Sequence, residues 1–216
     1  MNLSFKPQNQ LPEDRPVQII LASQSIGRKM LLDKLGVRFK TLITNVNEEV
    51  IVDKDPIKTI KRRAEAKAMD VVKNPRMYLL GEEDKYLVIA ADSMAILGKA
   101  TFGKAASKDD AKAMVKKLMG NTHTFVTAVN IVYMENQKVK KTYEAVIKTK
   151  VTMRKMKPDE IESYILRYDF SRFAAAYAIN ELPWDLVTKI DGSYTNVIGL
   201  PFETLLPILQ KHKLIV

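Results

Sequence analysis

The 216-residue chain has the length of one ordinary domain and is long enough to bury a hydrophobic core without disulfides. Its apolar share of 46% and charged share of 28% exclude a disordered, collagen-like or coiled-coil protein, and the absence of cysteine excludes thiol chemistry. The net charge of +10 favours an anionic partner, such as nucleic acid, a membrane surface or a phosphate-bearing small molecule.

Residues 1–16 are predicted to be a flexible extension, because they are polar, carry three prolines and show no periodicity. They lack the apolar core of a signal peptide, and the longest apolar run of the chain is far shorter than the roughly 20 residues of a membrane-spanning helix. We therefore expect a soluble, cytoplasmic protein without a membrane partner, in which residues 17–216 form a single domain.

Short apolar runs alternate with amphipathic segments in the first half of the chain. Ser25 is a plausible N-cap and Gly36 a plausible C-terminal stop for the first helix. In chain order we expect strands over 17–22 and 39–46 with a helix over 26–35 between them, a helix over 55–73, a strand over 87–91 that stops at Asp92, and a strand with a turn over 94–103.

The second half begins with a capping box at Ser107, which starts a helix that ends at Gly120. Two long alternating strands follow, with a turn at 136–137. The mixture of helices, short buried strands and long alternating strands predicts an α/β fold with a mixed, twisted sheet flanked by helices. The expected elements are strands over 124–134 and 143–153, a helix opening at Pro158, a strand over 186–190 and a closing helix over 202–213 interrupted by Pro207.

Three positions indicate more than packing, and the first is the segment 23–29. Here a strand runs into small polar residues before a helix whose first turn holds Arg28. Helix N-termini bind phosphate through free N–H groups, and an anion would offset a cation near the positive end of the helix dipole. The alternative is ordinary capping by Ser25 with exposed basic side chains.

The other two positions are Lys67 and Asp92. Lys67 lies at the edge of the apolar stripe of its helix, so it either extends along the rim of the core or points into a cleft. Asp92 ends an apolar run, and it either caps a strand end or acts there as a metal ligand or general base. Together the three positions indicate a polyphosphate held by N–H groups and cations beside a carboxylate.

Several short motifs also occur in a fixed order. They are residues 20–25 followed by Arg28 and Lys29, Glu48, 64–68, 89–93, 103–104, 120–128, 174–180 and 192–201. This order resembles the Maf family of nucleoside triphosphate pyrophosphatases over nearly the whole chain. The resemblance implies a deep nucleotide-binding cleft in a Maf or inosine triphosphate pyrophosphatase-like fold. It also implies hydrolysis of a nucleoside triphosphate to monophosphate and pyrophosphate with a divalent metal ion, Mg²⁺ or Mn²⁺.

Carried over to the matching positions, the resemblance makes Asp92 the catalytic carboxylate, which deprotonates the water that attacks the α-phosphorus. Asp92 and Glu48 are then the metal contacts, and an acidic residue among cations is expected to keep a low pKa, so that it is ionised and can bind metal. The resemblance also implies a homodimer. The substrate-binding residues that it implies are Ser23, Arg28, Lys67, Ser93, Lys104 and Asn180.

Departures from the family motifs concern the cations and the base pocket. Gly27 stands where the family has an arginine, Phe173 where it has a lysine, and Asn180 where a glutamine reads the base. We therefore expect a thinner set of cations, and the alternative function is a catalytically weak or inactive nucleotide-binding regulatory homologue. Nucleic-acid binding is a third hypothesis. The basic residues are scattered along the chain and the aromatic share is only 7%, and both features count against it.

Overall fold

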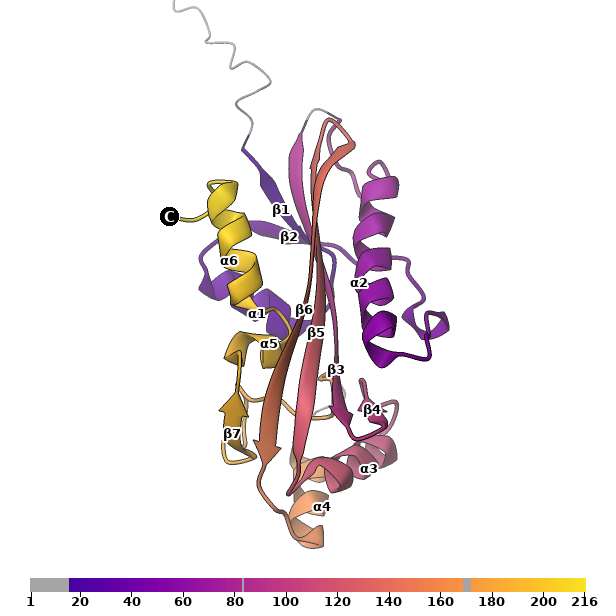
Figure 1. Cartoon of the computed structure of the whole chain (residues 1–216), viewed down its shortest axis with the longest axis vertical. Coiled ribbons are helices and arrows are strands. Elements are labelled where there is room, and N and C mark those ends of the chain that lie inside the picture. Colours follow the sequence, from indigo (N-terminus) through magenta and orange to yellow (C-terminus); the bar gives the residue numbers. More distant parts are fainter. Residues whose placement is uncertain (1–15, 83, 169–171) are drawn as a thin grey trace, which may run out of the picture.

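One mixed seven-stranded sheet organises the protein (Figure 1). The computed structural model describes residues 16–82, 84–168 and 172–216, so the predicted extension over 1–16 lies outside the described residues except for Pro16. The strand order is β2–β1–β3–β5–β6–β7, with β4 paired to β3. Among the described strands, the pairs β1–β2 and β1–β3 are parallel and the other pairs are antiparallel. The strands are β1 (Gln18–Leu21), β2 (Phe39–Thr41), β3 (Lys85–Leu97), β4 (Ala100–Phe102), β5 (Thr122–Glu135), β6 (Lys138–Met153) and β7 (Val187–Asp191).

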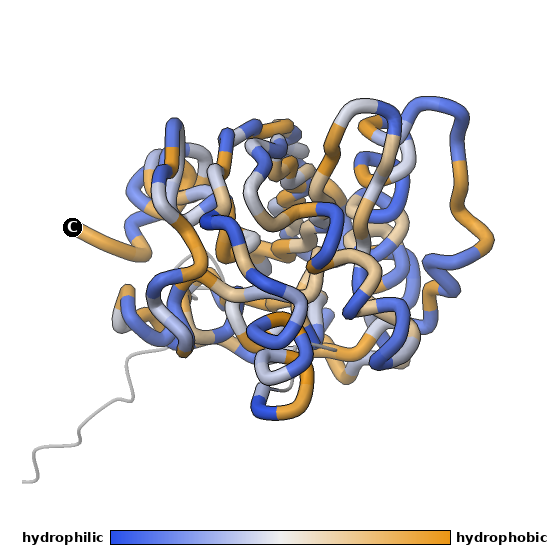
Figure 2. Tube along the Cα trace, turned by 90° about the horizontal axis from the view of Figure 1, so that it is seen from below, coloured by the Kyte–Doolittle hydropathy of each residue, from blue (hydrophilic) through white to orange (hydrophobic). Residues whose placement is uncertain are grey.

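Helices flank this sheet on both faces, as predicted for the fold. Helix α2 lies on one face, α1, α5 and α6 lie on the other, and α3 and α4 pack at one end of the long β5–β6 hairpin (Figure 1). The end-on view in Figure 2 shows that the outer turns are largely hydrophilic. The helices are α1 (Ile26–Lys34), the 3-10 helix η2 (Glu48–Val50), α2 (Pro56–Lys73), α3 (Lys108–Leu118), α4 (Pro158–Arg167), α5 (Tyr194–Ile198) and α6 (Phe202–Lys211).

Local signals set the helix and turn positions where the sequence predicted them. Ser25 caps α1 by accepting a hydrogen bond from the Arg28 backbone N–H, and Ser107 caps α3 in the same way. Asn136 and Gln137 both have positive φ, the geometry of a tight two-residue turn between β5 and β6. Within the described residues, no helix is both long and apolar enough to cross a membrane.

Several predicted boundaries are wrong, and pairing explains two of them. β2 ends at Thr41 rather than at residue 46, because its partner β1 ends at Leu21, which is opposite Thr41. β3 does not stop at Asp92 but continues to Leu97, because antiparallel β5 pairs with it to the end. Helix α6 continues through Pro207, since Leu205, Ile208 and Leu209 pack it onto the sheet. The short helix α5 was not predicted.

The pleat of β3 decides which way the side chains at 92 and 93 point. Val88 and Ala90 pack against α2, whereas Ile89 and Ala91 pack in the core under α1 and α6. Since successive residues of a strand face opposite sides, Asp92 faces α2 and Ser93 faces the α1 and α5 side.

The edge of β3 is bare where these two residues lie. β1 pairs with β3 up to Ile89, and β4 takes over only at Ala95. Between those points β3 has β5 on one side and no strand of the described residues on the other. A cavity lies at this interrupted edge, and both Asp92 and Ser93 line it.

Candidate active site

A cavity of about 430 Å³ opens at the bare edge of β3. Its volume lies in the range typical of small-molecule sites. All the side chains that the sequence predicted to bind substrate or metal line this cavity. They are Ser23, Arg28, Glu48, Lys67, Asp92, Ser93, Lys104 and Asn180.

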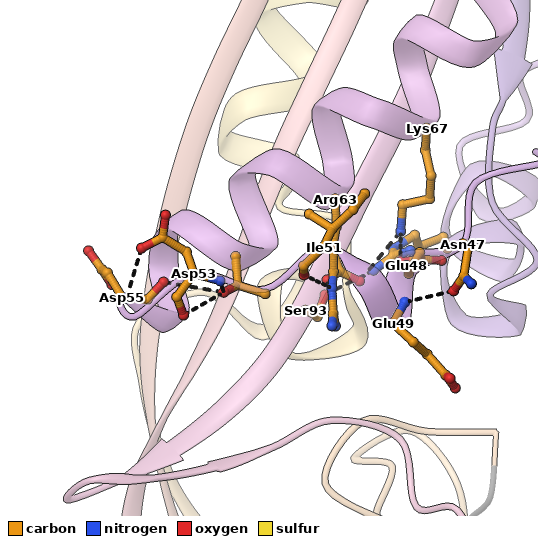
Figure 3. Close-up of polar contacts among 12 residues, drawn as sticks. Asn47, Glu48, Glu49, Ile51, Asp53, Asp55, Arg63, Lys67 and Ser93 are labelled. Atoms are coloured by element: carbon orange, nitrogen blue, oxygen red, sulfur yellow. Dashed lines mark hydrogen bonds and ion pairs between the residues drawn. The ribbon is translucent and has the colours of Figure 1, made fainter.

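Lys67 joins two carboxylates inside the cavity (Figure 3). Its Nζ lies 2.7 Å from Glu48 Oε2 and 3.4 Å from Asp92 Oδ1. The residue is only 4% exposed, so of the two sequence interpretations the cleft position is confirmed. A buried ammonium is stable only when carboxylates or carbonyls compensate for its lost hydration, and here two carboxylates do so.

Arg63 completes this cluster, although the sequence motifs did not identify it. Its Nε donates a hydrogen bond to Ile51 O at 3.0 Å (Figure 3). Its Nη1 lies 3.9 Å from Asp92 Oδ2. Arg63 therefore ties the loop that carries Glu48 to the carboxylate on β3. Its spacing of four residues from Lys67 on α2 was the available signal, because residues i and i+4 share one helix face.

Arg28 links three distant segments at the floor of the cavity. Its guanidinium donates to Gly199 O at 2.8 Å, Ser23 Oγ at 2.9 Å and Ser93 Oγ at 3.0 Å. The residue is 7% exposed, so Ser25 caps the helix as predicted but Arg28 is not an exposed basic side chain. Since these bonds use one N–H of each nitrogen, each terminal nitrogen keeps a second N–H for a ligand oxygen.

The pKa values of the two carboxylates shift in opposite directions. Burial raises the pKa of Asp92, the charge of Lys67 offsets this only in part, and the nearby charge of Glu48 raises it further. Burial also raises the pKa of Glu48, but the charge and close hydrogen bond of Lys67, helped by Arg28 and Arg63, outweigh it and the net shift is downward. The predicted low pKa is therefore confirmed for Glu48 and wrong for Asp92, which is the stronger base of the pair.

Further charged and polar side chains form the walls. Lys104 is exposed and Asn180 is partly buried, with its Nδ2 located 3.5 Å from Met30 Sδ. The set of cations is not thin, because Arg63 and Arg172 also line the cavity. Five basic side chains thus face three carboxylates there, which favours an anionic ligand. The basic residues are Arg28, Arg63, Lys67, Lys104 and Arg172, and the acidic ones are Glu48, Glu49 and Asp92.

The backbone at Gly27 lies too close to Ile198 to accommodate a side chain, so the arginine that the family has at this position does not fit here. A Cβ at this position would lie 2.8 Å from Ile198 O and 3.0 Å from Ile198 Cγ2. We expect Gly27→Ala to lower the free energy of unfolding by about 1–3 kcal/mol, because the backbone beside Gly199 must move. Urea denaturation measures this. Gly103→Ala is the control, since a Cβ there would meet nothing within 4 Å, and equal stability of the two variants would contradict the close approach.

Tyr177 forms part of the wall and is held from behind by His123, whose Nε2 lies 2.8 Å from Tyr177 Oη. Burial lowers the pKa of His123 to about 4. The unfolded chain takes up a proton near the ordinary histidine pKa and the native protein only near the lowered one, so stability falls as the pH drops through this window.

We expect this histidine to contribute a loss of about 2–3 kcal/mol between neutral pH and about pH 4.5. Denaturation of the wild type and of His123→Gln at both pH values isolates the contribution, because the carboxylates titrate alike in both proteins. An equally steep pH dependence in the variant would show that His123 is not its source.

Comparisons of the sequence with known families and relatives agree with the ordered motifs that resemble the Maf family. A family model described as Maf-like protein matches residues 18–212. A dTTP/UTP pyrophosphatase of Thermoanaerobacter sp. (strain X514) is 34% identical over 196 residues, which cover 91% of this chain and 97% of the relative. Another, from Pyrococcus furiosus, is 35% identical over 201 residues and covers 91% and 97%. A crystal structure of a nucleoside-triphosphatase (dITP/XTP pyrophosphatase) from Mycobacterium abscessus has a TM-score of 0.36 and 11% identity, covering 91% of this chain and 95% of that chain.

Proposed function

Because the chain belongs to the Maf-like protein family, we propose that it hydrolyses nucleoside triphosphates to the monophosphate and pyrophosphate. The observation that carries the proposal is the convergence of Asp92, Lys67, Glu48 and Arg28 in one cavity with a surplus of basic side chains. The relatives are named for dTTP and UTP, which makes these two nucleotides the first substrates to test.

Asp92 is the proposed general base. Water attacks the α-phosphorus, its proton passes to the Asp92 carboxylate, and the bond from the α-phosphorus to the bridging oxygen breaks to release pyrophosphate. The upward shift of the Asp92 pKa suits this role, because a stronger base takes the proton more readily. Lys67 and Arg28 stabilise the charge that develops on the phosphate oxygens, and their fixed positions mean that little reorganisation is needed.

Glu48 and Asp92 fit the predicted divalent metal ion. Mg²⁺ is commonly held by one or two carboxylates together with substrate phosphates, and both carboxylates here contact one positive charge, that of Lys67. In the described part of the chain, no group of three or more His, Asp or Glu side chains is placed to hold a metal. A Mg²⁺ or Mn²⁺ ion on Glu48 and Asp92 would therefore bind together with the triphosphate and neutralise part of its charge.

Pyrophosphate release from a panel of canonical and modified nucleoside triphosphates tests the function. We expect turnover with Mg²⁺ or Mn²⁺ and its loss when a chelator removes the ion. Absence of turnover on every substrate by folded protein contradicts the proposal. In that case, calorimetric binding of a triphosphate without pyrophosphate release favours the inactive nucleotide-binding regulatory homologue.

The location and the oligomeric state of the protein are also proposed. A cytoplasmic location suits an enzyme that acts on nucleoside triphosphates. The homodimer implied by the resemblance stays a prediction, and light scattering on the purified chain tests it.

A further inference from the structure

Behind the floor of the cavity, two hydroxyl groups continue the hydrogen bonding of Arg28 into the core. Arg28 Nη2 donates to Ser93 Oγ at 3.0 Å, and Ser93 Oγ lies 2.9 Å from Thr127 Oγ1. Thr127 Oγ1 in turn donates to Asn196 O at 3.1 Å. Thr127 is completely buried and is not part of the cavity lining, so it does not touch a ligand there.

The number of protons fixes the direction of this hydroxyl chain, which consists of Ser93 and Thr127. A carbonyl oxygen only accepts, so the single hydroxyl proton of Thr127 points to Asn196 O. Ser93 must then be the donor in the bond between the two hydroxyls. Since Ser93 Oγ also accepts from Arg28, its only proton is committed to the protein and cannot reach a phosphate oxygen, although Ser93 lines the cavity.

Ser23 shows the opposite pattern on the other side of the guanidinium. Its Oγ accepts from Arg28 Nη1 at 2.9 Å and from the Ser25 N–H at 3.2 Å. Its own hydroxyl proton has no acceptor among the residues that the structure describes, so it can donate to a ligand oxygen in the cavity. The two serines that contact Arg28 therefore differ in what their hydroxyls have left to offer.

The hydroxyl chain returns to Arg28 through the end of α5. Asn196 O accepts the Thr127 hydroxyl and also the Gly199 N–H, the latter at 2.9 Å. Gly199 O then accepts Arg28 Nε at 2.8 Å. Asn196 is fully buried, and its Nδ2 donates to Phe125 O at 3.3 Å, which ties α5 to β5. Because a planar guanidinium bonded at both Nε and Nη2 cannot turn in its plane, this closed ring of bonds fixes its direction.

We propose that Thr127 is a positioning residue for the hydrolysis, and that the Ser93 hydroxyl acts with it to orient Arg28 rather than to bind the substrate. This inference deepens the proposed function and rests on it. Arg28 has to point its remaining N–H groups at the phosphate oxygens as charge develops there, and a fixed direction removes the need to reorganise at that step. Loss of the hydroxyl chain should therefore lower kcat, while triphosphate binding, to which Lys67 and Lys104 also contribute, should change little.

Guanidinium ¹⁵N NMR of the ligand-free protein tests the orientation directly. We expect resolved Nη–H signals for the held Arg28, identified by their absence in Arg28→Lys. Thr127→Val has nearly the same shape without the hydroxyl, so Ser93 can turn away from Arg28 and the signals should broaden. Thr127→Ser keeps the hydroxyl and should keep the signals. Thr188→Val is the matched control, because it removes a hydroxyl that donates to Thr152 O at 3.2 Å outside the cavity lining.

Steady-state pyrophosphate release gives the second measurement. Thr127→Val and Ser93→Ala should each lower kcat by about tenfold and leave KM within about twofold, the effect of one lost hydrogen bond to a charged group. Thr127→Ser should restore most of the rate. Ser93→Ala/Thr127→Val should lose no more than Ser93→Ala alone, because both changes break the same chain. Ser23→Ala should also raise KM, since its hydroxyl is available to the substrate.

Two results would overturn the inference. One is a set of Arg28 signals that is unchanged in Thr127→Val, and the other is a raised KM with an intact kcat in Ser93→Ala, which would make Ser93 a substrate ligand. If Thr127→Val does not fold, Thr127→Ala takes its place in both measurements. The proposed function is judged separately by turnover of the wild type, and without turnover the NMR comparison still decides whether Thr127 and Ser93 orient Arg28.

Discussion

Asp92→Asn is expected to lower kcat for triphosphate hydrolysis by about 10²–10⁴-fold while triphosphate still binds. Asparagine has nearly the same shape but cannot accept the proton of the attacking water. Binding survives because Arg28 and Lys104 are untouched and Lys67 keeps Glu48 at 2.7 Å. Steady-state pyrophosphate release measures the rate, and calorimetry measures triphosphate binding.

The stability of this variant separates a chemical role from a structural one. The raised pKa of Asp92 shows that the folded protein disfavours its charged form, so replacing it with a neutral amide should cost little stability. Asp33→Asn, at an exposed position of α1 outside the cavity lining, is the matched control. A wild-type rate in Asp92→Asn would remove this residue from the mechanism.

Lys67→Met should damage both folding and activity. The change leaves Glu48 and Asp92 without the ammonium between them, and removing one partner of a buried ion pair costs about 3–5 kcal/mol. We expect the lower end of this range, because Arg63 and Arg28 still face the carboxylates. Urea denaturation measures the loss, and turnover should fall at least about 100-fold because the charge beside the reacting phosphate is gone.

The pH dependence of stability and a second substitution show whether uncompensated charge causes the loss of stability in Lys67→Met. Lys67→Met removes the strongest influence that lowers the pKa of both carboxylates, so both pKa values should rise. The native state then binds more protons than the wild type does, and the deficit in stability should shrink as the pH is lowered toward about pH 5. Lys67→Met/Asp92→Asn removes one uncompensated charge and should regain stability without regaining activity. A deficit that is independent of pH and persists in the double variant would assign the loss to packing instead.

Helix α2 shows what hydrophobic periodicity can predict and what it cannot. The spacing of apolar residues over 55–73 located the helix and placed Lys67 at the edge of its buried face. Periodicity says which residues share a face, but it does not say which element lies opposite. The contact with Asp92 therefore depends on β3 running under this helix, which is a matter of tertiary packing.

Asp92 likewise shows the difference between what a local pattern predicts and what tertiary packing decides. Its position after an apolar run marked it as a candidate, but the strand does not end there. Strand β3 continues along β5, and the opening beside Asp92 arises because β1 ends and β4 has not yet begun. The low pKa expected for acidic residues among cations holds for Glu48 but fails for Asp92, because the sequence does not show the burial that outweighs the cations there.

By itself the sequence determined the α/β class, the mixed sheet and most helix boundaries, because caps, turns and hydrophobic periods act between residues close in the chain. The other site residues came from the resemblance of its ordered motifs to the Maf family. Only the tertiary structure decided which of these residues meet. Arg28 bonds to Gly199 across 171 positions and to Ser93 across 65. The spacing of Arg63 from Lys67 puts both on one helix face, but the contact of Arg63 with Asp92 depends on how α2 packs against β3. Such pairings depend on strand order and on where each strand ends, and the chemistry of the cavity depends on how deeply those pairings bury its charges.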